Sequence, residues 1–429
     1  MELVTDNVMQ IPITDVVFRK DLYPRIEHDQ NKAQEYAENI DQLPPIEVNQ
    51  HKELIDGFHR LTAHRIKEKP TICCFITETK NESEFFSFAI QRNSTHGVQF
   101  SDRDRKKCAI RLYNGGEGLD KKEIAVVLSV SLRMVNNYLE KIDTDLREER
   151  KETIERMYLE CYTAQEIAEV VGLSKQKIDE KIGVWNEMEV GSKMFQSANF
   201  TDDFEVPIYN RWTFNKATNK TDHFGKTEQR IVENLLYLYT NPFDIVVDPF
   251  AGGGSTLDIC KKRFRRCWVS DRKPKPGLED KIRKLDVIEL LPPLNKRWSD
   301  VSLTYLDPPY WRQAEGKYSD DTEDLANYQN SDDFHDAMAG LVKKIASKQS
   351  QGVIALIIQP TQWCSPDRAF IDHVVEIIKR VGNKKLTIEN RVSCPYQTEQ
   401  YNAQQVNYAK DNKLLLVLTR ELIVWRIAR

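Results

Sequence analysis

The sequence lacks the features of a secreted or membrane-spanning chain. Its first residues, MELVTDNVMQ, contain neither a basic segment nor an apolar segment of the kind found in signal peptides. The longest apolar runs, GVIALII and LLLVL, are far too short to cross a bilayer. The eight cysteines include no C-x-x-C pair, and the eight histidines show no spacing typical of metal ligands. We therefore predict a cytoplasmic protein with reduced thiols, no membrane partner and no metal site.

An excess of positive charge is lacking too. The formal net charge is −4, which excludes a generally cationic nucleic-acid coat but allows a local basic patch. Two interpretations stay open for the most basic stretch, residues 261–276: a solvated helix end with its loop, or a contact with phosphate. Hydrophobic residues at 40% and charged residues at 30% are typical of a globular protein, and 429 residues suffice for about two to four domains.

The hydrophobic pattern divides the chain into three parts. Residues 1–98 mix short strands and helices, with PIEV, ELI and TICCFIT as strands and HRLTAHRIKEK as a helix, which predicts a small α+β domain. Residues 99–196 read as all-helical. In residues 197–429 the apolar strands DIVVDPF, RCWVSD, SLTYLDPP and GVIALIIQ alternate with helical segments. That alternation predicts a Rossmann-like, doubly wound α/β domain.

The helical part contains the same device twice. Asp120 with Glu123, and Thr163 with Glu166, form capping-box signals that begin two short helices. A tight turn and a second helix follow each, the geometry of a helix-turn-helix unit. The second helix of such a unit can enter the major groove of DNA, and the alternative is two helical hairpins that only pack. The predicted DNA-binding residues on the second helices are Arg133, Asn136, Asn137, Lys175 and Lys177.

A glycine-rich turn in DPFAGGGST joins a predicted strand to a predicted helix. Such a turn lets a ligand approach the backbone at the carboxyl edge of a sheet. The next strand ends on Asp271, placed to bind two ribose hydroxyls, and Asp286 lies where it can accept from an adenine amino group. No lysine follows the glycines as in a phosphate-binding loop, which disfavours a phosphate. Acids at the ends of successive strands suit a nucleoside without phosphate, and S-adenosylmethionine is such a ligand.

Two motifs together carry a family resemblance. DPFAGGGST followed by TYLDPPYW closely resembles the amino-methyltransferases of prokaryotes and phages that alkylate exocyclic amines of adenine or cytosine in DNA. Asp248, Phe250, Gly252 and Gly254 match the family's cofactor loop, and Asp307, Pro308, Pro309 and Tyr310 match its catalytic tetrapeptide. The upstream segment FGKTEQRIVENLLYLYTNPFD resembles the part that packs on the methionine end of the cofactor. It adds Phe224 and Thr227 as cofactor-binding candidates. The resemblance covers roughly the last 230 residues.

The resemblance implies a direct methyl transfer to a flipped base. An aromatic amine is a poor nucleophile because its lone pair is delocalised into the ring. A carboxylate at Asp307 and a proline carbonyl can accept hydrogen bonds from its two hydrogens and aim the lone pair at the methyl group. Tyr310 offers a ring on which the extruded base can stack. Methylation of cytosine C5 would need a Pro-Cys nucleophile, whereas this chain has the reverse order, Cys394-Pro395.

The first 98 residues resemble the N-terminal domain of ParB proteins, which shares a fold with sulfiredoxin. The resemblance is carried by Pro24-Arg25, PPIEV and the box GFHRLTA. ParB proteins with a nucleotide switch usually carry G-E-R-R-x-R-A there. In this chain Phe58, His59 and Thr62 replace a Glu and two Args, which argues against CTP hydrolysis. Two interpretations of Gly57, His59 and Arg60 stay open: local hydrogen bonds at a helix start, or an anion or nucleotide pocket.

We therefore predict a site-specific, S-adenosylmethionine-dependent methyltransferase of double-stranded DNA, with adenine N6 favoured over cytosine N4. A ParB-like domain and two helix-turn-helix units precede its catalytic domain. The alternatives are a ParB-like DNA clamp or regulator with weak or no transferase activity, and an RNA amino-methyltransferase. The sequence leaves open whether two chains form a homodimer.

Overall fold

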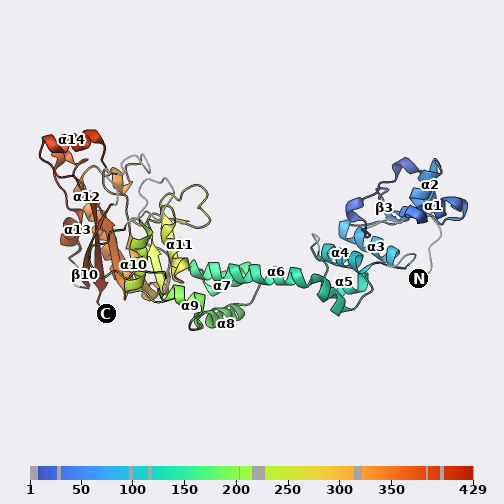
Figure 1. Ribbon diagram of the computed structural model, residues 1–429, viewed down its shortest axis with the longest axis horizontal. Helices are drawn as coiled ribbons and strands as arrows, with labels where there is room; N and C mark the ends of the chain where they lie inside the picture. Colours follow the sequence, from blue (N-terminus) through green and yellow to red (C-terminus); the bar gives the residue numbers. More distant parts are fainter. Residues whose placement is uncertain are drawn as a thin grey trace. The chain divides into compact units, whose positions relative to one another are not determined.

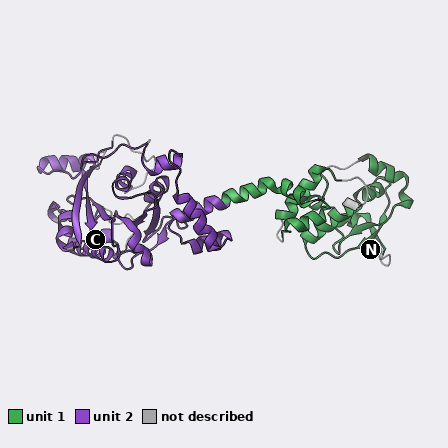
Figure 2. Cartoon of the chain, turned by 90° about the horizontal axis from the view of Figure 1, so that it is seen from below, with its two compact units in different colours: residues 1–149 green, residues 150–429 purple. Residues whose placement is uncertain are grey.

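The computed structural model of the chain describes residues 8–26, 30–95, 100–114, 118–201, 203–214, 228–313, 321–382, 385–396 and 401–428 (Figure 1). The chain forms two compact units, residues 1–149 and 150–429 (Figure 2). The boundary lies inside one long helix, α6, within the part of the sequence predicted to be a separate helical domain. The predicted division into three domains stays a prediction.

The described helices and strands have the following bounds. The helices are α1 (Gln30–Glu38), α2 (Phe58–Ile66), α3 (Glu82–Thr95), α4 (Asp102–Asn114), α5 (Lys121–Val127), α6 (Leu132–Leu159), α7 (Ala164–Val171), α8 (Lys175–Asn186), α9 (Lys193–Ala198), α10 (Gln229–Tyr239), α11 (Ser255–Lys262), α12 (Ser331–Lys348), α13 (His373–Val381) and α14 (Ala403–Asp411). The strands are β1 (Met9–Pro12), β2 (Ile46–Val48), β3 (Leu54–Asp56), β4 (Thr71–Ile76), β5 (Ile245–Asp248), β6 (Arg266–Asp271), β7 (Arg283–Lys284), β8 (Val301–Leu306), β9 (Val353–Ile358), β10 (Leu386–Pro395) and β11 (Thr419–Ile427).

The first unit begins with a small α+β domain. Its four strands form a sheet in the order β1-β4-β2-β3, with β2 parallel to β4. Helix α2 follows β3 after a single glycine, Gly57, whose φ is +109°. A Cβ at this position would lie 2.6 Å from Cγ2 of Ile46, so the tight strand-to-helix turn requires glycine. The strands and helix predicted for this domain are confirmed.

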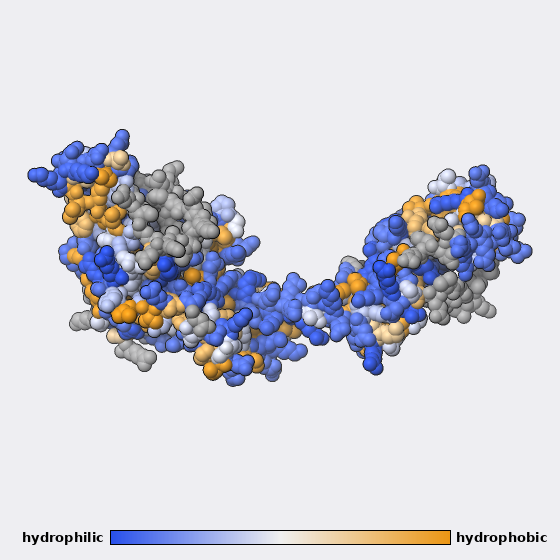
Figure 3. Space-filling model, in the orientation of Figure 1, coloured by the Kyte–Doolittle hydropathy of each residue, from blue (hydrophilic) through white to orange (hydrophobic). Residues whose placement is uncertain are grey.

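Helices α4 and α5 and the first part of α6 complete the first unit. Asp120 and Glu123 form the predicted capping box at the start of α5, and Val135 and Leu139 of α6 are fully buried against α5. The second helix is much longer than a helix-turn-helix unit needs, because residues 132–159 contain neither Gly nor Pro to end it. Residues 144–152 are exposed on all sides, and the middle of α6 is largely hydrophilic in Figure 3.

The second unit contains a seven-stranded sheet in the order β10-β11-β9-β8-β5-β6-β7. Strands β5 to β9 are parallel, whereas β11 runs antiparallel between β9 and β10. The four apolar strands predicted from the sequence correspond to β5, β6, β8 and β9, which confirms the doubly wound α/β class. The strand order reverses between β5 and β8. In open α/β sheets ligands bind at the carboxyl ends of the strands at this point.

The second pair of short helices, α7 and α8, docks on the amino-terminal edge of this sheet. Trp185 of α8 packs on Phe243, which precedes β5, with 5.8 Å between ring centroids. Nη2 of Arg283, at the start of β7, donates to the carbonyl of Glu160 before α7 at 2.9 Å. The predicted helix pair is therefore present, but it lies at the sheet edge opposite to the ligand-binding one.

Two arginines of the basic stretch at residues 261–276 fit neither interpretation offered for it. Arg263 and Arg265 have 0% and 2% of their surface exposed. Arg263 pairs with Glu233 and donates to the carbonyl of Ser197, and Arg265 donates to Thr240 and to the carbonyl of Ala198. These two cations hold α9 and the end of α10 together. They form part of the domain's interior.

Two further observations concern the whole chain. All eight cysteines are free thiols. Within the described ranges, every helix is too short or too polar to cross a bilayer.

Candidate active site

The glycine-rich turn and the tetrapeptide lie side by side at the carboxyl edge of the sheet. The turn follows β5 and residues 307–310 follow β8, and these two strands are neighbours on either side of the point where the strand order reverses. Gly252 and Gly254 have φ angles of +48° and +79°, in the left-handed region that favours glycine. Gly254 caps α11, and Thr256 is buried in its first turn. The turn therefore presents backbone, without side chains, to the crevice.

Asp271, at the end of β6, is tied to this turn. Its Oδ2 accepts from the backbone N–H of Gly252, and its Oδ1 accepts from that of Lys273, each at 2.9 Å. Burial raises the pKa of Asp271 above its ordinary value. Asp286 lies beyond β7 and is paired with the Arg272 guanidinium at 2.9 Å, and its other oxygen accepts from Ile288 N–H. An adenine amino group would have to share these oxygens with Arg272 and Ile288.

Asp248 ends β5 and has only 2% of its surface exposed. One carboxylate oxygen accepts from the N–H of Phe250 at 2.9 Å, and the Thr256 hydroxyl is a second partner. Burial raises the pKa of Asp248 to about 7, and the negative charges of Asp307 and Asp271 add to the rise. Asp307 and Asp271 thus lie close enough to the buried Asp248 to destabilise its charged form, and these acidic surroundings favour a cationic ligand.

The raised pKa of Asp248 predicts a pH-dependent stability. The folded state holds the Asp248 proton up to pH of about 7, whereas the unfolded state loses it near the ordinary pKa of 3.8. Stability should therefore fall as pH rises through this window, by at most about 1.4 kcal/mol per pH unit. An Asp248→Asn variant should lack this loss, so its stability relative to wild type should increase from pH about 4 to about 7. Urea unfolding of both chains at a series of pH values measures the difference, and parallel curves would contradict a protonated Asp248.

The Asp307 carboxylate accepts hydrogen bonds from two tyrosine hydroxyls. Tyr310 Oη donates to Oδ1 at 3.1 Å, and Tyr305 Oη donates to Oδ2 at 3.3 Å. Burial raises the pKa of both phenols well above the ordinary value, so they remain neutral donors. Asp307 and Tyr310 are partly exposed, whereas Pro308 is buried. The crevice therefore offers a carboxylate, next to two proline residues that lack N–H groups, to a hydrogen-bond donor entering it.

Sequence reasoning missed a buried arginine behind this carboxylate. Arg420, the second residue of β11, has 6% of its surface exposed, and its guanidinium lies 4.4 Å from the ring centroid of Tyr396. Burial alone would lower its pKa. The nearby Tyr310, Tyr396, Asp307 and Tyr305 raise it above the ordinary value, so Arg420 stays charged. Tyr396 in turn donates to Gln359 Oε1 at 3.0 Å. The only sequence signal was a lone cation at the start of an apolar strand, TRELIVWRI.

The other predicted site residues lie elsewhere or cannot be placed. Phe224 and Thr227 fall outside the described residues. Phe250 is partly buried against the main core of the second unit. The predicted DNA-binding residues are all exposed, with Arg133, Asn136 and Asn137 in the first unit and Lys175 and Lys177 on α8. The structure does not bring the lysines to the crevice, because α8 lies at the opposite edge of the sheet.

At the predicted anion pocket at the start of α2, the positive group is the Arg60 guanidinium, and most of it already contacts other groups of the chain. Arg60 donates to the carbonyls of Pro44 and Pro45, at 3.2 and 2.5 Å, and pairs with Asp56 at 2.6 Å. His59 is partly buried, with its ring 5.7 Å from that of Phe58. These contacts favour the local hydrogen-bond interpretation of Gly57, His59 and Arg60, and the anion pocket stays a prediction.

Comparison with known proteins gives one family and several distant structures. A family model described as DNA methylase, N6_N4_Mtase, matches residues 48–275, just over half of the chain. The match includes the glycine turn and Asp271 and ends before Asp307. No curated protein matches the chain.

Two of the similar solved structures have different functions. The first is the C-terminally truncated chromosome-partitioning protein ParB from Caulobacter crescentus, complexed to the centromeric parS site. It is 14% identical, covers 40% of this chain and 97% of its own, and has a TM-score of 0.25. The second is a SAM dependent methyltransferase from Archaeoglobus fulgidus. It is 13% identical, covers 46% and 94%, and has a TM-score of 0.27. At such TM-scores these similarities carry no argument about the fold. The fold class is assigned from the chain's own strands and helices.

Proposed function

Since the chain belongs to the N6/N4 DNA methylase family and its cofactor is S-adenosylmethionine, we propose that it methylates double-stranded DNA at adenine N6, in preference to cytosine N4. The target base is flipped from the duplex into the crevice at Asp307–Tyr310. The observation that carries this proposal is the position of the glycine turn and the tetrapeptide on the neighbouring strands β5 and β8, where the strand order reverses.

The residues of the crevice fit S-adenosylmethionine. The glycine turn admits a ligand close to the backbone, and Asp271 at the end of β6 can accept from ribose hydroxyls. Asp271 and Asp307 make the crevice acidic, which suits a ligand with a positive sulfonium and a positive amino group. When bound, the cofactor supplies an electrophilic methyl group.

The tetrapeptide binds the second reactant, the target base with its exocyclic amine. Asp307 accepts a hydrogen bond from one N–H of the target amine, which takes the place of a tyrosine hydroxyl. A proline carbonyl accepts a hydrogen bond from the other N–H. The nitrogen lone pair is then directed away from both acceptors. Tyr310 provides the ring on which the base stacks. The proton released after transfer can pass to Asp307, the nearest base in the crevice.

Two experiments test the function and its alternatives. Sequencing of methylated bases in DNA from cells that express the protein should show one modified sequence, with N6-methyladenine in it. Purified protein with labelled cofactor should methylate duplex DNA and leave RNA unmodified. Labelled RNA would favour an RNA methyltransferase, and DNA binding without any transfer would favour a ParB-like regulator.

Asp271 should hold the cofactor. We expect an Asp271→Ala variant to bind S-adenosylmethionine about 1.5–3 kcal/mol more weakly, the usual size of a hydrogen bond to a charged group. Titration calorimetry measures this. Thermal unfolding is the control, because the variant also releases the N–H of Gly252. A folded variant with unchanged affinity would place the ribose elsewhere.

DNA recognition is proposed to begin at the start of α6. Arg133, Asn136 and Asn137 are exposed on its first turns, and one good bidentate contact to a base is worth about 1–3 kcal/mol. Changing these three residues to alanine should weaken duplex binding and leave the affinity for S-adenosylmethionine unchanged. Fluorescence titration at fixed salt measures both. Arg147→Ala, an exposed arginine in the middle of the same helix, is the matched control. Equal losses in both variants would indicate a general charge effect in place of recognition.

A further inference from the structure

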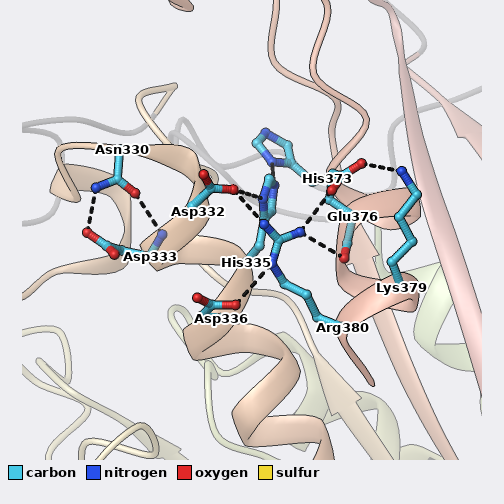
Figure 4. Close-up of polar contacts among 9 residues, drawn as sticks. All are labelled: Asn330, Asp332, Asp333, His335, Asp336, His373, Glu376, Lys379 and Arg380. Atoms are coloured by element: carbon cyan, nitrogen blue, oxygen red, sulfur yellow. Dashed lines mark hydrogen bonds and ion pairs between the residues drawn. The ribbon is translucent and has the colours of Figure 1, made fainter. Parts of the chain in front are cut away.

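A buried chain of three side chains lies behind the segment that follows Tyr310. Nε2 of His335, in α12, lies 2.8 Å from Nδ1 of His373, the first residue of α13. Nε2 of His373 lies 2.8 Å from the hydroxyl of Thr361, in the loop after β9. All three residues have at most 1% of their surface exposed. We call His335, His373 and Thr361 the histidine chain, and Figure 4 shows its two imidazoles.

The partners of Thr361 indicate a direction for the hydrogen bonds in the chain. Its hydroxyl lies 3.2 Å from the carbonyl of Trp311, which can only accept. The Nε2 group of Gln313 lies 2.9 Å from the same hydroxyl and 3.1 Å from the carbonyl of Pro360, so this amide donates to both. The hydroxyl has one hydrogen, and Trp311 takes it. With the hydroxyl hydrogen donated to the Trp311 carbonyl, His373 donates through Nε2–H.

The tautomer of His373 in turn sets the tautomer of the outer histidine, His335. With its hydrogen on Nε2, neutral His373 has a lone pair on Nδ1, which must accept from Nε2–H of His335. A second proton on His373 would face that donor and break the bond. Burial, together with the neighbouring His335, lowers the pKa of His373 to about 3, which agrees with the neutral form. The chain thus runs one way, from His335 to the carbonyl of Trp311.

Charged groups surround the outer end. Asp332 Oδ1 lies 4.0 Å from Nδ1 of His335. Arg380 of α13 pairs with Asp332 and Asp336 of α12 and with Glu376 of its own helix, as Figure 4 shows. Burial and the charge of Arg380 lower the pKa of His335, against the three carboxylates. These ion pairs join the first turns of α12 to the last turn of α13 and so hold the two helices, each carrying one histidine, against each other.

The inner end acts on the backbone next to the active site. Trp311 directly follows Tyr310 and is buried, and its indole N–H donates to the carbonyl of Tyr328 at 2.8 Å. Arg312 has a φ of +55°, a conformation that costs a non-glycine residue free energy and needs support from its surroundings. Gln313 N–H donates to the carbonyl of Tyr310 at 3.2 Å. The turn after the tetrapeptide is therefore held in place by the hydrogen bonds that Trp311 and Gln313 make with Thr361.

We propose that the histidine chain is a positioning device for methyl transfer: it fixes the peptide after Tyr310 and thereby the orientation of the tetrapeptide toward the target base. This inference rests on the proposed function. The three residues touch neither base nor cofactor, so they act through the backbone of Trp311. Catalysis is sensitive to such placement, because a shift of about 1 Å can slow a reaction about 100-fold.

Kinetics of hydroxyl variants at Thr361 test the proposal. Thr361→Val removes the hydroxyl at nearly constant volume and should lower kcat for DNA methylation about 10- to 100-fold, with the affinity for S-adenosylmethionine unchanged. Thr361→Ser keeps the hydroxyl and should restore most of kcat. Thr240→Val is the matched control. That buried hydroxyl bonds the carbonyl of Leu236 and the Arg265 guanidinium at the opposite sheet edge, so its loss should cost stability and leave kcat unchanged. A folded Thr361→Val enzyme with wild-type kcat overturns the proposal.

A spectroscopic measurement on the wild-type protein needs neither DNA nor the variant. Long-range proton–nitrogen correlation of the ¹⁵N-labelled histidines should show His335 and His373 with the hydrogen on Nε2 at neutral pH, both exchanging slowly with solvent. A hydrogen on Nδ1 of His373, or a charged His373, would overturn the hydrogen-bond chain. Absence of DNA methylation by wild type, with the expected spectrum, would instead count against the proposed function.

Discussion

An Asp307→Ala variant is expected to bind S-adenosylmethionine normally, while its methyl transfer to DNA falls by about 10²–10³-fold. In the proposed mechanism the carboxylate is the acceptor that shapes the target amine, a role that it plays only in the transition state. The loss should therefore appear in kcat and in kcat/KM alike. Single-turnover transfer from labelled cofactor, together with calorimetric titration of the cofactor, separates the two effects.

Asp307→Asn is the matched control for this experiment. The amide oxygen can still accept from Tyr310 or from the target amine. We expect the Asn variant to keep more activity than the Ala variant. Thermal unfolding must accompany both, since each leaves the buried Arg420 with one negative charge fewer nearby. Equal rates for wild type and a folded Ala variant would rule out Asp307 as the essential acceptor.

Tyr310→Ala is expected to cause the second large loss. In the proposed mechanism the flipped base stacks on this ring, a contact worth about 1–3 kcal/mol, so transfer should slow by roughly 5- to 150-fold. Tyr310→Phe keeps the ring and removes only the donor to Asp307 Oδ1. Because the target amine replaces that donor during the reaction, the Phe variant should retain most of the rate. Rates on duplex DNA measured for the three chains provide the comparison.

A second outcome would change the role of the phenol. If Tyr310→Phe were as slow as Tyr310→Ala, the hydroxyl that orients Asp307 would matter more than the ring. Tyr305→Phe is then the informative comparison, since Tyr305 donates to the other carboxylate oxygen from a buried position. Loss in the Tyr310 variant alone would assign the effect to the residue that faces the base.

The strands and the catalytic edge could be predicted because their signals are local. Short apolar runs such as VIALII can only be buried, and each of the predicted strands around the crevice ends at an acid, a glycine turn or a proline. Parallel strands with helices between them place these ends on one edge of the sheet. The positions of Asp248, Asp271 and Asp307 therefore followed from the strand pattern alone.

Other features depend on pairs that are distant in sequence, and these were missed. Arg263 and Arg265 read as surface cations because their partners, Glu233, Ser197 and Ala198, lie 30 or more residues away. The docking of α7 and α8 depends on Trp185 meeting Phe243, and no local pattern encodes that contact. The same holds for His335 and His373, separated by 38 residues. Propensity and periodicity describe neighbours along the chain, whereas these contacts are set by tertiary packing.

The place of β11 in the sheet has a consequence for biosynthesis. This strand follows all the other described strands in the chain, yet it lies between β9 and β10 and carries Arg420 to the active site. A ribosome will have released the glycine turn and the tetrapeptide long before it makes residues 419–427. Until then no strand lies between β9 and β10, and the buried Arg420 is absent. The nascent chain should therefore be inactive toward DNA, and activity should appear only when this late strand inserts, a step that closes a long loop and is slow for that reason.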